Sequence, residues 1–365
     1  MSAAPRVRRA GSFALAVLVL GLAAGCGSSP DHSRPAPEGL PPPPRSSGLP
    51  DNCSGTVSDP DQVAAAVRGA QPGDTLCFSG AKLADLVIEM TTSGLPGRPI
   101  SLIGGGTTLR SIGVNADHVV VDGFVLAEGD GLNLKGDDLE ARNNVVLDAT
   151  DDGIVCVECV GGTIESNTVW RADGTGIVID GERSLVRDNT VRESVMREQR
   201  DADGVRFFGT GLRLIGNTIR DIKTTDYPER QAPHTDCFQT YDTRDSRPTY
   251  DVVIVDNVCE NVDVQCLIAT SNETRSTEVP TGVTSILFEH NICSVNGSQG
   301  ILLESFPNVV VRDNTFSGPR YRAVLLARGS VNGTVVDNTV LGNIPPFEID
   351  DESRPGFHAD GNNFR

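Results

Sequence analysis

The chain has 365 residues and a formal net charge of −18, from 49 acidic and 31 basic residues. Such acidity argues against nucleic-acid binding, because a phosphate backbone is itself negatively charged. Aromatic residues make up only 5% of the chain while Gly occurs 39 times, a composition that favours many short strands and turns over a helical bundle.

The first 25 residues are predicted to be a signal peptide, because a basic start precedes an apolar run at 13–22 that is too short to span a membrane. The run leads into Leu-Ala-Ala-Gly-Cys, which ends at Cys26 and resembles a bacterial lipoprotein signal. This resemblance implies that Cys26 is lipidated; an ordinary secretory signal is the alternative. We therefore expect an exported protein, either secreted or held on the outer face of the bacterial membrane by its lipid anchor alone. Residues 26–50 are Pro-rich and predict an extended tether.

A repeat follows. One element is an Asn before a short apolar strand. The spacing from one such Asn to the next is 22–24 residues in four of the seven intervals. Its members are Asn144, Asn167, Asn189, Asn217, Asn257, Asn291, Asn314 and Asn338. A second element is a small residue, usually nine residues further on, that opens another apolar strand, as at Gly153 and Gly176. This period predicts an all-β fold, a single-stranded right-handed parallel β-helix of about nine coils over residues 51–342. The Asn side chains are expected to form a structural ladder at a corner, in left-handed backbone.

Residues 61–68 are predicted to form a short helix that caps the N-terminal end of the stack. Together with Pro-Gly-Asp-Thr at 72–75, Gly-Arg-Pro-Ile at 97–100 and the Asn repeats, this helix resembles the pectate-lyase-type β-helix superfamily over roughly residues 55–342. The resemblance implies the fold and includes both lyases and hydrolases of polysaccharides, so it does not decide the reaction. Residues 343–365 are interpreted as a polar C-terminal tail or cover, and we expect a monomer.

Eight Cys follow Cys26, an even number in an exported protein. Equivalent positions of neighbouring coils lie about 5 Å apart, within reach of a disulfide. The predicted bridges are Cys237–Cys266, Cys259–Cys293 and, at the N-terminal cap, Cys53–Cys77. Cys156 and Cys159 remain, and their pairing stays open. Zinc is the alternative, but no His accompanies these residues at ligand spacing.

Insertions break the repeat after Asn189, Asn217, Cys237 and Cys266, and such insertions often carry function in a solenoid. Strand alternation predicts that several side chains meet on the outer face that they surround. These are Asp201, Asp203, Arg206, Phe208, His234, Asp236, Gln239 and Tyr241, with Asp180 in the preceding coil. An Asp before a strand can instead cap a turn. The aromatic residues suit the apolar face of a sugar, although loops packed over them would also explain them.

The first functional hypothesis is a polysaccharide lyase acting on an acidic, uronate-containing glycan. Elimination needs a base for the C5 proton, which His234 or Lys223 could supply, and positive charge beside the uronate, which Arg206 could supply. Calcium held by Asp201, Asp203 and Asp236 would add to that charge, and no organic cofactor is expected. Lyases of the fold that the chain resembles use Lys or Arg bases and often calcium, whereas this chain has only three Lys.

Two alternatives stay open. Asp203 and Asp236 could act as the paired carboxyl groups of a glycoside hydrolase. The Asn-Thr-Asp and Gly-His-Gly motifs of polygalacturonases are missing from the sequence, so this hypothesis ranks lower. A non-catalytic lipoprotein that binds glycan or supports the envelope would use the same face, with Phe208, Gln239, Tyr241 and Asp180 contacting the sugar.

Overall fold

The computed structural model describes residues 48–365 except 198–200, 226, 229–230, 243–246 and 272–278. The predicted signal peptide, Cys26 and most of the Pro-rich tether lie outside the described residues. All described residues belong to one compact unit. No helix in the described ranges is long and apolar enough to cross a membrane.

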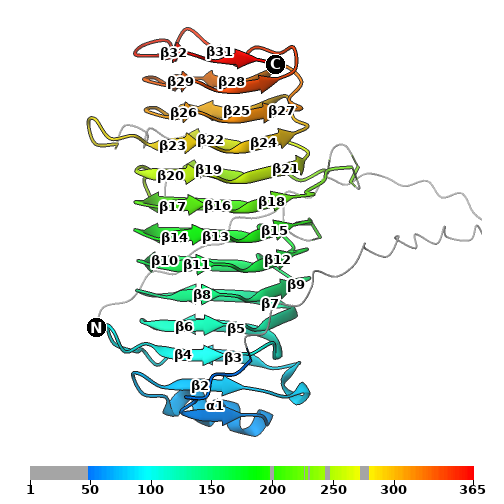
Figure 1. The fold of residues 1–365 in the computed structure, drawn as a ribbon, viewed down its shortest axis with the longest axis vertical. Coiled ribbons are helices and arrows are strands. Elements are labelled where there is room, and N and C mark those ends of the chain that lie inside the picture. The colour runs from blue at the N-terminus through cyan, green and yellow to red at the C-terminus, as the bar shows by residue number, and fades with distance from the viewer. Residues whose placement is uncertain (1–47, 198–200, 226, 229–230, 243–246, 272–278) are drawn as a thin grey trace, which may run out of the picture. The chain divides into compact units, whose positions relative to one another are not determined.

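The described residues form stacked coils of parallel strands (Figure 1). The first row is a sheet of 13 strands, as counted over the described residues. It contains β1 (Gly55–Val57), β2 (Thr75–Phe78), β4 (Ile100–Ile103), β6 (Val119–Asp122), β8 (Glu140–Arg142), β11 (Thr163–Glu165), β14 (Leu185–Arg187), β17 (Arg213–Ile215), β20 (Val252–Val255), β23 (Ile286–Glu289), β26 (Val310–Arg312), β29 (Thr334–Val336) and β32 (His358–Asp360).

A second sheet, of 20 strands in the same described ranges, contains two further rows, which the long strands β5 and β7 join. The second row is β3 (Val87–Met90), β5 (Thr108–Asn115), β7 (Val125–Lys135), β10 (Ile154–Val160), β13 (Ile177–Glu182), β16 (Val205–Thr210), β19 (Phe238–Asp242), β22 (Leu267–Ser271), β25 (Gln299–Glu304), β28 (Arg322–Ala327) and β31 (Phe347–Ile349). The third row is β9 (Val145–Leu147), β12 (Thr168–Trp170), β15 (Thr190–Arg192), β18 (Thr218–Arg220), β21 (Val258–Val262), β24 (Ile292–Val295), β27 (Thr315–Ser317), β30 (Thr339–Leu341) and β33 (Asn363–Phe364).

The N-terminal end of the stack is covered by the predicted helix, α1 (Pro60–Gly69), which packs against β1 and β3 (Figure 1). The side chain of Asp59 caps it by accepting a hydrogen bond from the backbone N–H of Asp61 at 3.2 Å. Val63 and Val67, one turn apart, are buried on the face that meets the sheet. A single-turn 3₁₀ helix at Ala81–Leu83 follows β2.

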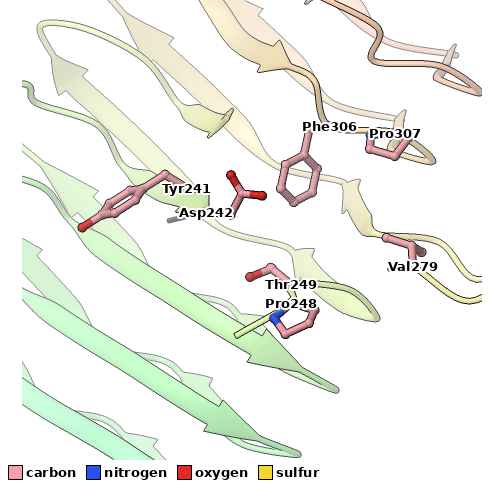
Figure 2. Close-up of a pocket in the computed structure, with 7 residues that line it drawn as sticks. All are labelled: Tyr241, Asp242, Pro248, Thr249, Val279, Phe306 and Pro307. Carbon is pink, nitrogen blue, oxygen red and sulfur yellow. The ribbon is translucent and has the colours of Figure 1, made fainter. Parts of the chain in front are cut away.

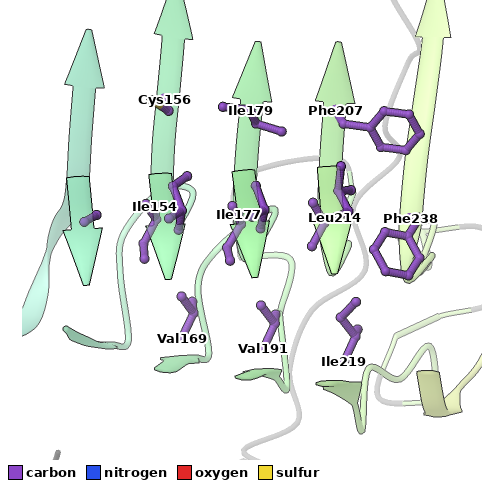
Figure 3. Packing of buried hydrophobic residues seen from close by; sticks show 14 of the residues in the cluster. Ile154, Cys156, Val169, Ile177, Ile179, Val191, Phe207, Leu214, Ile219 and Phe238 are labelled. Carbon is purple, nitrogen blue, oxygen red and sulfur yellow. The ribbon is translucent and has the colours of Figure 1, made fainter. Parts of the chain in front are cut away.

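The core consists of inward-facing apolar residues that stack from coil to coil (Figure 3). Ile154, Ile177, Val205 and Phe238 are successive partners in the second row, and each is fully buried. Burying a side chain of this size stabilises the fold by about 1.5–3 kcal/mol. Each coil packs mainly on its two neighbours. The strand pairing of the second row therefore continues without a register shift from β13 through β16 and β19 to β22, the strands around the predicted site.

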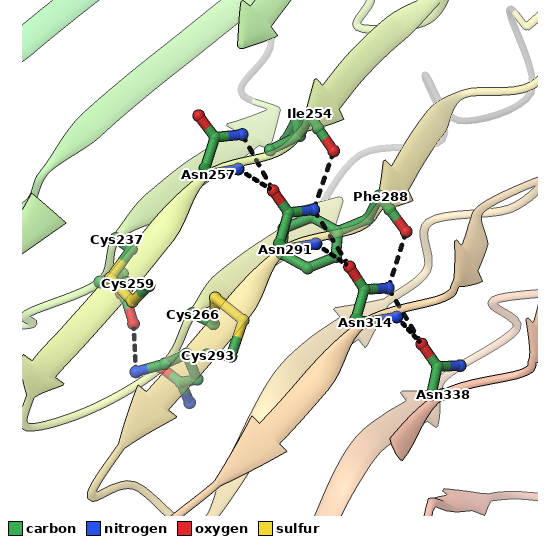
Figure 4. The surroundings of a disulfide bond; sticks show 12 residues. Cys237, Ile254, Asn257, Cys259, Cys266, Phe288, Asn291, Cys293, Asn314 and Asn338 are labelled. Atoms are coloured by element: carbon green, nitrogen blue, oxygen red, sulfur yellow. Dashed lines mark hydrogen bonds between the residues drawn. A yellow bond between two sulfur atoms is a disulfide. The ribbon is translucent and has the colours of Figure 1, made fainter. Parts of the chain in front are cut away.

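The Asn side chains form the predicted ladder (Figure 4). The Nδ2 of Asn217 donates to the backbone oxygen of Val186 at 2.9 Å and to Oδ1 of Asn257 at 3.0 Å. The backbone N–H of Asn217 donates to the same Oδ1 at 2.8 Å. One detail differs from the prediction, since the left-handed backbone belongs to the residue before each Asn, such as Asp256 with φ 58°. The ladder is therefore structural, and it continues to Asn362.

The predicted pairing of Cys237 with Cys266 and of Cys259 with Cys293 is wrong. Cys237 bonds to Cys259 and Cys266 bonds to Cys293, with Cα–Cα distances of 6.1 and 5.8 Å (Figure 4). Each bond closes one coil from inside, between the second and third rows. In-register neighbours such as Cys259 and Cys293 carry their Cβ atoms side by side, whereas residues facing each other across the interior carry them toward one another.

The same interior contact exists in coils without Cys. A Cβ added to Gly176 would lie 2.2 Å from Cγ1 of Val191, and one added to Gly204 would lie 2.5 Å from Cγ2 of Ile219. Only glycine fits opposite the branched side chain at these positions. In the coil of Cys237 and Cys259, two cysteines replace this pair of a glycine and a branched residue. The other two disulfides are the predicted Cys53–Cys77 bridge and one that joins Cys156 to Cys159.

Residues 343–365 do not form the expected tail or cover but add another coil. Its strands β31, β32 and β33 pair in parallel with β28, β29 and β30. At the other end, β1 to β8 precede Asn144, the first Asn of the counted repeat. The stack therefore extends beyond the counted repeats at both ends.

Candidate functional site

Five of the predicted residues, Asp180, Arg206, Phe208, Gln239 and Tyr241, lie on the outer face of β13, β16 and β19. Arg206 and Gln239 are directly paired across β16 and β19, and Asp180 pairs with Phe208 across β13 and β16. The rings of Phe208 and Tyr241 meet edge to face with centroids 5.1 Å apart. Strand alternation therefore places these side chains together, as the sequence predicted.

Arg206 is the centre of the polar group. Its Nε donates to Oε1 of Gln239 at 2.8 Å, and its Nη2 donates to Asp203 at 2.7 Å and to Asp201 at 3.1 Å. The guanidinium carbon also lies 5.8 Å from the centroid of the Tyr241 ring. Only 16% of the Arg206 side chain is exposed, so its hydrogen bonds hold it in one orientation.

Asp203 and Asp236 lie beneath this group and are completely buried. An oxygen of Asp203 accepts the backbone N–H of Asp236, and an oxygen of Asp236 accepts that of Gln265, each at 3.0 Å, so both carboxyl groups cap the next coil. Burial raises the pKa of Asp203 to about 6, although Arg206 opposes the change. Burial and the neighbouring Asp203 raise the pKa of Asp236 well above its usual range. Because neither carboxyl group reaches the surface, these residues can position other groups but cannot touch a substrate.

His234 is the exposed partner of this buried pair. Its side chain is 64% exposed, and its Nδ1 lies 4.0 Å from Oδ2 of Asp236. That oxygen is buried and makes no hydrogen bond of normal geometry to the described residues. The backbone oxygen of His234 accepts the N–H of Ala202 at 2.9 Å, which fixes the histidine beside the preceding coil. The arrangement is an imidazole with a carboxyl group behind it.

The first two insertions are tied to each other beside the site. The backbone N–H of Met196, in the first, donates to the hydroxyl oxygen of Tyr227, in the second, at 2.8 Å. Arg197 reaches down the stack and pairs with Asp148 at 2.7 Å. These contacts hold the walls of the site against the coils below.

Two predicted residues have other partners. Lys223 donates to Asn261 and to Oδ1 of Asp263, the latter at 3.1 Å, and no described contact joins it to Arg206. Asp180 lies next to Phe208 but forms an ion pair at 3.2 Å with Arg247, which the sequence did not single out. Arg247 belongs to the insertion after Cys237, where no repeat register assigns it a place.

The donor set does not fit calcium as the side chains stand. The guanidinium of Arg206 lies between Asp201 and Asp203, and the carboxyl groups of Asp203 and Asp236 are completely buried. Calcium binding by these residues stays a prediction. Among the described residues, the side chains grouped closely enough to hold a metal ion are Glu289, His290 and Asp313.

A hollow beside Tyr241 is too small for a sugar (Figure 2). Its volume is about 10 Å³, room for one water molecule. Its lining residues are Tyr241, Asp242, Pro248, Thr249, Val279, Phe306 and Pro307. A glycan at this site would therefore lie on the open outer face of the strands.

Comparison with known proteins agrees with the fold. The model of a right-handed beta helix region matches residues 130–281. No curated protein sequence matches the chain. The tailspike protein of E. coli bacteriophage HK620, solved in complex with a pentasaccharide, is similar in structure with a TM-score of 0.53 and 11% identity, over 84% of this chain and 61% of that one. A double mutant of the same tailspike has a TM-score of 0.54 and 10% identity, over 84% and 61% of the two chains.

The GH136 lacto-N-biosidase from Eubacterium ramulus is similar with a TM-score of 0.50 and 10% identity, over 81% of this chain and 62% of that one. This chain thus spans less than two thirds of each of these structures. Likeness at such low identity shows the fold alone. The fold predicted from the Asn repeats is confirmed: the chain is a right-handed parallel β-helix.

Proposed function

We propose that the protein acts on a polysaccharide lying across the outer face of β13, β16 and β19. The observation that carries the proposal is the half-buried pair of Phe208 and Tyr241 beside the hydrogen-bonded Arg206. Aromatic faces cover the apolar side of a sugar, and fixed polar groups orient its hydroxyls. Similar structures include a tailspike in complex with a pentasaccharide and a lacto-N-biosidase, which supports a saccharide ligand.

The charge of the site favours a neutral glycan over a uronate polymer. Arg206 already faces two carboxyl groups at 2.7 and 3.1 Å, and Asp236 lies beneath them. A uronate would bring a further carboxylate to a single guanidinium and would be opposed by the acidic groups around it.

For the reaction, we propose hydrolysis. Hydrolysis needs a carboxylic acid that holds its proton and a second carboxylate that activates water or attacks the sugar. Asp201, whose side chain is 31% exposed, presents such a carboxylate beside Arg206. The buried Asp203 holds Arg206 by a hydrogen bond, and the buried Asp236 stands behind His234.

Elimination from a uronate is the second candidate. The exposed His234 with the Asp236 carboxyl group behind it is an arrangement that suits a base. Against elimination stand the compensated charge of Arg206 and the engagement of Lys223 with Asp263.

The test is to incubate the exported domain with neutral and uronate polysaccharides, with and without calcium. New reducing ends without ultraviolet absorbance of an unsaturated sugar indicate hydrolysis, and new absorbance indicates elimination. Binding without either product indicates a non-catalytic glycan-binding protein. If no glycan is bound or cleaved, the proposal is wrong.

Variants locate the activity. Arg206→Ala should lower activity by about 100-fold, because the groups around it lose their common partner. Arg213→Ala is the matched control, since that guanidinium pairs with the exposed Asp251 on the first row. Tyr241→Ala removes only the aromatic face and serves where Arg206→Ala folds poorly. Full activity in Arg206→Ala and Tyr241→Ala together would place the site elsewhere.

We also propose that the protein is exported and lipidated at Cys26. All eight later cysteines form disulfides, which persist in oxidising compartments. Labelled palmitate should enter the wild-type protein and not the Cys26→Ser variant. A wild-type protein that is secreted without label would instead carry an ordinary signal peptide.

A further inference from the structure

We propose that Glu289, His290 and Asp313 bind a zinc ion, at a site separate from the glycan face and independent of the proposed hydrolysis. One ligand atom from each of these side chains lies within 4.8 Å of the other two. The three residues occupy the corner at which the first row ends and the third row begins, beside β23 and β26. Exposed carboxylates alone are common on an acidic protein, and the imidazole among them distinguishes this group.

The backbone presents these side chains from a repeated conformation. Asp256, His290 and Asp313 hold the same place in three successive coils, with φ of 58°, 54° and 56°. Each comes directly before an Asn of the ladder (Figure 4). The backbone N–H of His290 donates to the oxygen of Arg312 in the next coil at 3.3 Å. Because one conformation repeats at the strand spacing of about 4.8 Å, the three side chains leave the corner in the same direction.

Glu289 is held in place from the neighbouring coil. It is the last residue of β23 and pairs in register with Arg312 of β26. Its Oε1 lies 2.8 Å from Nε of Arg312, and only 15% of its side chain is exposed. A carboxylate has about four lone-pair sites, so this ion pair leaves others for a metal ion. The glutamate is therefore fixed in position and still able to bind.

A further carboxylate lies behind the imidazole. Nδ1 of His290 is 3.9 Å from Oδ1 of Asp256, in the preceding coil. A histidine that binds a metal commonly directs its other ring nitrogen to a carboxylate, which orients the ring. With Nδ1 next to Asp256, Nε2 is the nitrogen left for the ion. Asp256 is thus a positioning residue of the site.

The charge and the types of ligand favour zinc. Three carboxylates, of Asp256, Glu289 and Asp313, outnumber the one guanidinium of Arg312, so the corner attracts a cation. Imidazole suits zinc and other transition-metal ions, whereas calcium and magnesium take oxygen ligands. Zinc binds His nitrogen and carboxylate oxygen at about 2.0–2.2 Å, a distance that small side-chain rotations bring within reach here.

A bound ion would join two neighbouring coils. Glu289 and His290 come from one coil and Asp313 from the next, and all three come together only in the folded chain. An ion that binds the folded state alone raises the stability of that state. The thermal stability of the protein should therefore depend on zinc.

The same corner offers a matched control. Asp337 holds the place of Asp313 one coil further on, with φ of 54°, and it is not a member of the grouped residues. Asn adopts left-handed backbone readily, so replacing His or Asp by Asn at these positions preserves the backbone conformation.

The experiment is calorimetric titration of the purified protein, prepared without a polyhistidine tag and treated with a chelator, with zinc and with calcium. The wild type should bind zinc more tightly than calcium, at one ion per chain. His290→Asn should weaken zinc binding by more than about 100-fold, and Asp313→Asn and Asp256→Asn by at least about tenfold. Asp337→Asn should bind as the wild type does.

The melting temperature, followed by the fluorescence of the buried Trp170, gives a second measurement. Zinc should raise it in the wild type and in Asp337→Asn but not in His290→Asn. No binding at one ion per chain, equal affinity for calcium, or unchanged zinc affinity in His290→Asn would overturn the proposal. None of these results depends on whether the protein cleaves a glycan.

Discussion

Asp203→Asn should remove a large part of the pH dependence of stability. Burial raises the pKa of the Asp203 carboxyl from 3.8 to about 6. Between these values the native state keeps a proton that the unfolded state has released, so the free energy of unfolding falls as the pH rises. A shift of about two units corresponds to a loss of about 3 kcal/mol, complete above about pH 6 and absent below about pH 4. Asn cannot ionise, so the variant lacks this loss.

The assay is urea unfolding between about pH 4 and pH 7, followed by the fluorescence of Trp170, the single tryptophan, which is buried. The wild type should lose about 3 kcal/mol more than Asp203→Asn over this range. Asp203 is one cause of the raised pKa of Asp236, so Asp203→Asn can only reduce the Asp236 contribution, a change of the same sign as the expected difference. Asp251→Asn, which changes an exposed partner of Arg213, should follow the wild-type curve. Parallel curves for wild type and Asp203→Asn would refute the reasoning.

Three further predictions concern the scaffold and the ligand. Asn217→Ala should destabilise the protein by about 3 kcal/mol, because it leaves several buried groups of the ladder without partners, whereas the exposed Asn133→Ala should cost less than about 1 kcal/mol in the same urea assay. Tyr241→Ala should weaken glycan binding about tenfold by calorimetry, and Tyr321→Ala, at a residue that is 61% exposed in the last coils, should not. Peptide mapping of the oxidised protein should recover both bridges that close single coils, and a bridge between neighbouring coils would contradict the structure.

The features that could be predicted from the sequence are those that depend on the repeat period. The Asn ladder, the capping helix and the meeting of Arg206 with Gln239 and of Phe208 with Tyr241 all follow from counting positions in coils. Lys223 and Arg247 lie in insertions, where counting stops, so their partners could not be predicted. Their ion pairs depend on how each insertion folds back on the stack.

Two errors came from using only part of the repeat. The disulfides were predicted from equivalence between coils, without asking which positions face each other inside one coil. Gly204 and Ile219 occupy the positions that Cys237 and Cys259 occupy in the next coil, and this joint replacement was visible in the sequence. The last coil was missed because its residues are polar, although Asn362 follows Asn338 by 24 residues, the step of the preceding repeat.

The two disulfides that each lie within one coil affect how far the inserted loops can vary in length and sequence. Both lie in the coils that carry the insertions after Cys237 and Cys266, where the chain leaves the stack between its second and first rows. The disulfide between the second and third rows keeps such a coil closed whatever the length or conformation of its inserted loop. The entropic cost of closing the loop itself rises only slowly with its length. These two coils can therefore accept longer, shorter or differently composed loops while the strand register beneath stays fixed. Variation in ligand preference can then arise at these loops without loss of the fold.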